Sequence, residues 1–166
     1  MSDAMSQNYA NFTPKDFDHF DCVKISKGIY LLLAFVLRGY LVWIMSVTNM
    51  QDRVSVIQWV YPDPKLFYLS LFSGAIGLFV LLLLSLRRPD ASDWVKTSWR
   101  YLRLYLVAAL MFDFIVNLFG FFYWQQLTLL WLVVDALFVL AFILFLVLSQ
   151  RVKININEFP QKLPEK

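Results

Sequence analysis

The sequence predicts an all-α integral membrane fold: a four-transmembrane-helix bundle whose N- and C-termini are both cytoplasmic. Three observations predict it: apolar runs of membrane-spanning length, a composition poor in charge, and basic residues gathered on one side of the runs. Hydrophobic residues make up 60% of the chain and charged residues only 16%, an imbalance typical of membrane spans. We expect a single membrane domain over residues 1–166, with polar cytoplasmic tails at 1–28 and 150–166.

Four apolar runs are each close to the roughly 20 residues that a helix needs to cross a bilayer. In chain order they are Ile29–Thr48, Leu66–Leu86, Leu104–Trp124 and Leu127–Ser149. The runs are apolar on every side, whereas the helices of a soluble protein of this length would carry polar outer faces. The last two runs are separated at Gln125 and Gln126, where we expect a turn, because about 45 apolar residues are too many for one crossing.

Basic residues are sorted by side. Most of them lie in the two tails and in the connection between the second and third runs: Lys15, Lys24, Lys27, Arg87, Arg88, Lys96, Arg100, Arg103, Arg151, Lys153, Lys162 and Lys166. The opposite side carries only Arg53 and Lys65. The positive-inside rule therefore places both tails in the cytoplasm. The net charge of +3 follows from this topology, and we do not take it as a sign of nucleic-acid binding.

The outer connection between the first two runs is long enough for structure of its own. Its apolar residues at helical spacing are Val54, Ile57 and Val60. This spacing predicts a short helix on the membrane surface. Tyr61, Pro62 and Asp63 then form an outer-loop turn, because proline cannot continue a helix. Two interpretations of the turn stay open: a rigid start to the second span, or a periplasmic contact or binding element.

Four polar side chains stand inside the apolar runs: Arg38, Asp113, Asn117 and Asp135. At the rise of an α-helix they lie about 15, 16, 10 and 12 Å from the outer ends of their runs. A lone charge at mid-membrane is costly, so such residues normally face protein or water. Since the helices alternate in direction and the depths are similar, we expect the four side chains to meet in one intramembrane polar cluster.

Small residues form stripes that suit close helix packing. The stripe of the third run is Ala109, Asp113, Asn117 and Gly120, and that of the second run is Ser70, Ser73, Gly74 and Gly77.

The polar cluster has a structural and a functional interpretation. In the structural one, Arg38 forms an ion pair with Asp113 or Asp135, Asn117 completes the hydrogen bonds, and the network sets the register of the helices. In the functional one, the carboxylates relay protons or ions, as carboxylates within spans often do. One arginine against two aspartates leaves one negative charge in excess, which a bound proton would neutralise. No run contains the paired glycine and proline that often break transporter helices.

Motifs for chemistry are sparse. His19 is the only histidine and Cys22 the only cysteine, so we expect neither an intrachain disulfide nor a metal site. The sequence contains no glycine-rich phosphate loop and no nucleophile motif, and we expect no cofactor and no enzymatic activity. The C-terminal segment Asn155–Lys166 is polar and carries two prolines, so we expect it to be mobile.

Several short motifs resemble one protein family. Phe17-Asp18 precedes Lys24, the first run contains Arg38 and then Trp43, Tyr61-Pro62-Asp63 opens the second run, and Arg87-Arg88 closes it. In this pattern, over residues 16–150, the chain resembles the proteobacterial inner-membrane proteins of unknown function of the YfeZ type. The resemblance implies a multi-pass protein of the bacterial inner (plasma) membrane, and it implies no activity.

The sequence thus favours a small inner-membrane accessory or assembly protein. Its expected partners are the lipid bilayer and either another membrane protein or a second copy of the chain, without nucleic acid. The alternative is a proton-linked transporter or channel subunit that uses Asp113 and Asp135. A membrane-embedded enzyme acting through the same two carboxylates is a further alternative.

Overall fold

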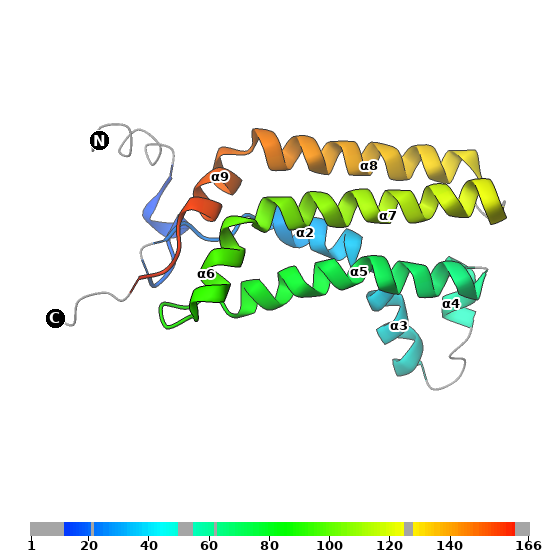
Figure 1. Cartoon of the computed structure of the whole chain (residues 1–166), viewed down its shortest axis with the longest axis horizontal. Coiled ribbons are helices and arrows are strands. Elements are labelled where there is room, and N and C mark those ends of the chain that lie inside the picture. The colour runs from blue at the N-terminus through cyan, green and yellow to red at the C-terminus, as the bar shows by residue number, and fades with distance from the viewer. Residues whose placement is uncertain (1–11, 21, 50–54, 62, 125–127, 162–166) are drawn as a thin grey trace.

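The computed structural model describes residues 12–20, 22–49, 55–61, 63–124 and 128–161. Across these residues the regular secondary structure is helical, apart from one isolated bridge between Phe17 and Val23. The elements in order are η1 (Pro14–Asp16), α2 (Lys27–Val36), α3 (Arg38–Thr48), α4 (Ser55–Val60), α5 (Pro64–Ser85), α6 (Asp93–Arg100), α7 (Leu102–Trp124), α8 (Leu129–Leu148) and α9 (Gln150–Asn157). Figure 1 shows α5, α7 and α8 lying lengthwise beside one another, with α7 in the middle.

The three long helices correspond to the second, third and fourth predicted spans. Each is long and apolar enough to cross a membrane. Helix α5 begins at Pro64, where proline suits the first helical position, and the Asp63 carboxylate caps it by accepting a hydrogen bond from the Lys65 backbone N–H at 2.8 Å. The outer face of α8 is apolar and largely exposed, as a face toward lipid would be.

The first predicted span is not one straight helix. Helices α2 and α3 are bent by 68° relative to each other, at Leu37, whose ψ of 10° departs from helical geometry. The chain therefore has three spanning candidates, or four if the bent pair is one span. The sequence did not predict this bend, because no glycine–proline pair marks it.

Small residues let the bent pair approach α5 closely. A Cβ atom added at Gly39 would lie 2.6 Å from Ser70 Oγ, and one at Gly74 would lie 2.8 Å from the ring of Tyr40. The predicted small stripe of α5 is therefore the surface on which α2 and α3 cross. Because of this close crossing, α3 stays in contact with α5 although it leaves the bundle axis (Figure 1).

The described ends of the chain meet at the end of the bundle that carries α6 and α9 (Figure 1). There Asn155 is fully buried. Its side-chain amide donates to the Val23 carbonyl oxygen at 2.8 Å and accepts from the Ser26 N–H at 3.0 Å, while the Trp99 indole N–H donates to its backbone oxygen at 3.0 Å. Glu158 accepts from the Val23 N–H at 2.8 Å. We call these five residues the end network.

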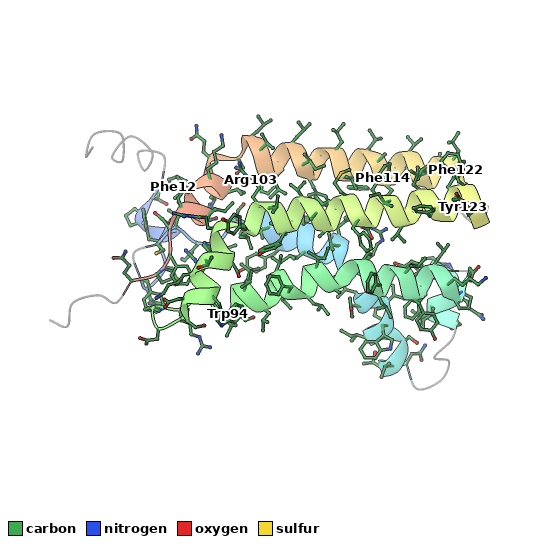
Figure 2. The ribbon with its side chains drawn as sticks, viewed as in Figure 1. Phe12, Trp94, Arg103, Phe114, Phe122 and Tyr123 are labelled. Atoms are coloured by element: carbon green, nitrogen blue, oxygen red, sulfur yellow. The ribbon has the colours of Figure 1, made fainter. Side chains whose placement is uncertain are left out.

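The end network corrects the expectation of mobility for the described part of the C-terminal segment, residues 155–161, whereas residues 162–166 lie outside the described residues. Residues 150–157 form α9, and the buried Asn155 ties this helix to the N-terminal segment and to α6. Two polar side chains of the segment, Asn155 and Glu158, accept hydrogen bonds from backbone N–H groups. At the opposite end of the molecule, Figure 2 shows Phe122 and Tyr123 on the last turn of α7, where exposed aromatic side chains suit a membrane–water interface.

Candidate intramembrane site

The predicted polar side chains meet where α2 gives way to α3. Arg38, the first residue of α3, forms an ion pair with Asp113 of α7, with 2.9 Å between Nη1 and Oδ2. Its Nη2 atom lies 3.4 Å from Oδ1 of Asp135 on α8. One guanidinium group thus joins three helices. We call Arg38, Ser73, Asp113, Asn117 and Asp135 the charge cluster.

The two carboxylates of the cluster have different surroundings. The Asp113 side chain is 1% exposed, and its Oδ1 accepts a hydrogen bond from the Ser73 hydroxyl at 3.1 Å. Among the described residues, neither Arg38 Nη1 nor Asp113 Oδ2 has a hydrogen-bond partner, so their ion pair is what compensates both buried atoms. Asp135 is 12% exposed, and its Oδ2 accepts from the Asn117 amide at 3.0 Å. Asp113 is therefore the enclosed partner of Arg38 and Asp135 the outer one.

Helix geometry explains why these residues reach one another. Asn117 follows Asp113 by four residues on α7, so both lie on the same face of that helix. Ser73 belongs to the small stripe of α5, where α3 passes closely. The guanidinium carbon of Arg38 also lies 4.7 Å from the centre of the Phe35 ring on α2, a cation–π distance. The bend at Leu37 turns Arg38 toward α7 and α8 while Phe35 stays beside it.

The outer-loop turn reaches the cluster through hydroxyl groups. The Tyr61 hydroxyl lies 2.8 Å from Ser70 Oγ, and the buried Tyr61 lines the same cavity as Arg38. Ser70 in turn accepts at its carbonyl oxygen from the Ser73 hydroxyl at 3.0 Å. Of the predicted turn residues, Tyr61 thus joins the site, Asp63 caps α5, and Pro62 lies outside the described residues.

A cavity of about 560 Å³ borders the cluster. It is lined by Phe35, Arg38, Trp59, Val60, Tyr61, Leu66, Asn117, Trp131, Leu132, Val134, Asp135 and Phe138. These residues come from the α2–α3 bend, α4, the start of α5, α7 and α8. The polar groups of Arg38, Asn117 and Asp135 form one part of the wall, and aromatic rings form much of the rest.

Sequence reasoning missed the cavity and the serine and tyrosine links. The helical spacing in the outer connection pointed to α4, which forms over Ser55–Val60, but nothing in that spacing predicts that α4 and α8 line one cavity. Ser73 stood in the small stripe, where its hydroxyl could have been considered as a donor to Asp113. Among the described residues, no group of three or more histidine, cysteine, aspartate or glutamate side chains is arranged to hold a metal ion.

Comparison with known proteins gives one match. A family model described as "Protein of unknown function (DUF2919)" matches residues 12–158. Searches of curated proteins and of solved structures find no match. The match covers both ends of the described bundle and every residue of the charge cluster.

Proposed function

This chain belongs to the DUF2919 family, whose function is unknown, and we propose from its geometry that it is an accessory or assembly protein of the bacterial inner membrane. In this proposal the chain crosses the bilayer four times, with both termini in the cytoplasm. The motif pattern shared with the YfeZ-type proteobacterial proteins supports the location. The proposed accessory role rests on the bend between α2 and α3 in the first span.

The path of the chain supports four crossings. Helix α2 begins beside α6 and α9, whereas α5 begins at the opposite end of the bundle (Figure 1). The chain is therefore at one end of the bundle at Lys27 and at the opposite end at Pro64, as a first crossing between them would require. The end that holds α6, α9 and the N-terminal segment also carries most of the basic residues, which supports a cytoplasmic position for that end.

The exposed apolar surface of α3 is the observation that carries the accessory role. Helix α3 leaves the bundle axis after the bend and packs on α4 and α5. Its large exposed side chains are Leu41, Trp43, Ile44, Met45 and Val47. The charge cluster anchors the first residue of this helix, so the divergence is built into the fold. A helix that diverges from the bundle axis and exposes apolar side chains offers a surface on which a helix of another membrane protein can pack.

Crosslinking within the membrane tests this role. A photoreactive amino acid at Met45, 60% exposed on α3, should crosslink to one protein in stoichiometric yield. The same amino acid at Leu140, 55% exposed on α8, serves as the control that reports contacts expected of any lipid-facing position. Equal crosslinking patterns from the two positions, or no protein adduct at Met45, would contradict an accessory role through α3.

A second candidate function is a proton-linked transporter or channel subunit using Asp113 and Asp135. The observation that favours it is the position of Asp135 at a cavity wall, next to a bent span. Proton flux in liposomes that contain only this protein, abolished by Asp135→Asn, would support it. A purified protein without flux but with a stoichiometric partner would support the accessory role instead.

The orientation has its own test. In a Cys22→Ala background, Asp93→Cys at the start of α6 should resist a membrane-impermeant thiol reagent in intact cells, because it would lie in the cytoplasm. Ser55→Cys on α4 should react, because it would face the periplasm. Both positions are exposed. Labelling of Asp93→Cys in intact cells would reverse the proposed orientation.

A further inference from the structure

The charges around the cavity do not cancel. Arg38 and Asp113 are 2.9 Å apart and compensate each other, with Asp113 enclosed behind the cluster. Asp135 is left with the longer 3.4 Å contact to Arg38 and a hydrogen bond from Asn117, an uncharged amide. With one arginine between two aspartates, the excess negative charge belongs to the carboxylate that lines the cavity.

The other walls suit a positive charge on an apolar body. Five aromatic residues line the cavity: Phe35, Trp59, Tyr61, Trp131 and Phe138. Tyr61 directly follows α4, the other four come from α2, α4 and α8, and Trp59 and Trp131 are 87% and 63% exposed, so their rings are accessible. Aromatic faces attract cations through their quadrupole, tryptophan most strongly. The valine and leucine side chains of the lining add apolar surface.

The volume of the cavity and the charge of its wall together limit the chemical class of ligand that it can bind. A cavity of about 560 Å³ is within the usual range for small organic molecules and is far larger than a proton or a bare metal ion needs. An anion would meet the Asp135 carboxylate, and Arg38 already faces two carboxylates. A purely apolar molecule would bury Asp135 against a partner that cannot compensate its charge.

We infer that this cavity is a binding site for an amphipathic organic cation, an ammonium group carried on an aromatic or alkyl body. The ammonium group lies against Asp135, and the body lies between the rings of Trp59, Trp131 and Phe138. Arg38 and Asn117 act as positioning residues that hold the Asp135 carboxylate at the wall. The site does not depend on the accessory role, because its residues belong to one chain.

Binding of benzyltrimethylammonium to the purified full-length protein in lipid nanodiscs tests the inference. Its neutral isostere neopentylbenzene, with carbon in place of nitrogen, is the matched control ligand, and benzenesulfonate is the anionic one. Tryptophan fluorescence and calorimetry should report saturable binding of the cation that is at least about tenfold tighter than that of either control. Equal affinity for the cation and the neutral isostere would overturn the assignment.

Two variants separate the site from partition into lipid. Asp135→Asn keeps the size of the side chain and should weaken cation binding about tenfold or more, while Asp93→Asn, at the far end of the molecule on α6, should leave it unchanged. If Asp135→Asn does not fold, Trp59→Leu gives the answer, because Trp59 is exposed on α4 and should weaken binding about threefold or more through its ring. Unchanged affinity in a folded Asp135→Asn or Trp59→Leu variant would overturn the site. A failed search for a partner at α3 leaves this result untouched.

Discussion

The end network and the charge cluster hold helices together with different kinds of polar group. Both join helices that are distant in sequence through buried polar side chains. The end network uses the neutral amide of Asn155, paired mainly with backbone groups, and it lies where the chain leaves the bundle. The charge cluster uses a guanidinium and two carboxylates in the middle of apolar helices.

The difference shows what each arrangement can be used for. Each hydrogen bond of Asn155 is made to another group of the chain that the fold brings into place, so the end network is complete within the protein. The cluster has unequal charges, and its uncompensated carboxylate lies at a cavity. Buried ion pairs are weak evidence for stability, because desolvation offsets much of their attraction. An excess charge within a span is therefore a stronger indication that a ligand, a proton or a partner binds there than a complete amide network is.

The largest expected effect comes from breaking the cluster. Arg38→Leu leaves two carboxylates without their cation and should lower the free energy of unfolding by about 3–5 kcal/mol, as breaking a buried pair does. Adding Asp113→Asn should restore more stability than adding Asp135→Asn, because Asp113 is the closer and more enclosed partner, at 2.9 Å against 3.4 Å. Thermal unfolding in detergent measures both double variants. Equal rescue, or none, would contradict the assignment of Asp113 as the main partner.

Breaking the end network should have the next largest effect. Asn155→Ala removes the partners of the Ser26 N–H and of the Val23 carbonyl oxygen, and unsatisfied buried polar groups are costly. We expect a loss of about 2–4 kcal/mol, with earlier proteolysis of the C-terminal segment. Asn157→Ala, at an exposed position of the same helix, is the control and should change little. Resistance of Asn155→Ala to proteolysis equal to that of the control would mean that α9 is held by other contacts.

The close crossing of α3 and α5 lies beside the charge cluster and is sensitive to side-chain volume. Gly39→Val would bring a side chain against Ser70, since even a Cβ atom there lies 2.6 Å from Ser70 Oγ. Overpacking of this kind costs about 1–3 kcal/mol and should also displace Tyr61 from its contact with Ser70. Leu41→Val, exposed on the same helix, provides the comparison. A Gly39→Val protein as stable as Leu41→Val would show that α3 does not cross α5 so closely.

The contrast between the charge cluster and the end network also explains which features could be predicted from the sequence. Long apolar runs have one way to satisfy their backbone groups in a membrane, so three of the four predicted spans correspond to α5, α7 and α8. The meeting of Arg38, Asp113, Asn117 and Asp135 followed from their similar depths, because charges inside a bilayer must find partners. Both the spans and the polar cluster follow from the lack of water in a bilayer core, and they depend little on how individual side chains pack.

The features that were missed depend on contacts between distant segments. Beside the bend at Leu37, Gly39 and Tyr40 pack on the small stripe of α5, and a stripe predicts contact without predicting its angle. Asn155 bonds to Val23 across 132 positions, and an asparagine in a polar tail looks the same whether it is solvated or buried. The cavity required both the bend and the position of α4, so neither its volume nor its lining could be inferred.

The smallest expected effect concerns a second arginine–aspartate ion pair, which is exposed to water. Arg151 Nη2 lies 3.2 Å from Asp16 Oδ1, and both side chains are about one-third exposed. Hydrogen bonds from the Thr13 hydroxyl and backbone N–H, together with the charge of Arg151, hold the pKa of Asp16 below its ordinary value of 3.8. Folding thus favours the carboxylate form. Its contribution to stability is present above pH 3.8 and is lost as the pH falls through the lower pKa of the folded state.

Acidification should therefore loosen the N-terminal segment slightly and leave the bundle folded. Between about pH 5 and pH 3, hydrogen-exchange protection of the Lys24 amide, which donates to the Asp16 carbonyl oxygen at 2.8 Å, should fall more in the native protein than in Asp16→Asn. Rates corrected for intrinsic exchange measure this, with Asp93→Asn as the exposed control. Arg38→Leu and Asp16→Asn each remove one member of an arginine–aspartate pair, and the first should cost far more because water screens and solvates the second. Comparable losses from the two variants would mean that Arg38 lies in water, and the membrane position of the charge cluster would be wrong.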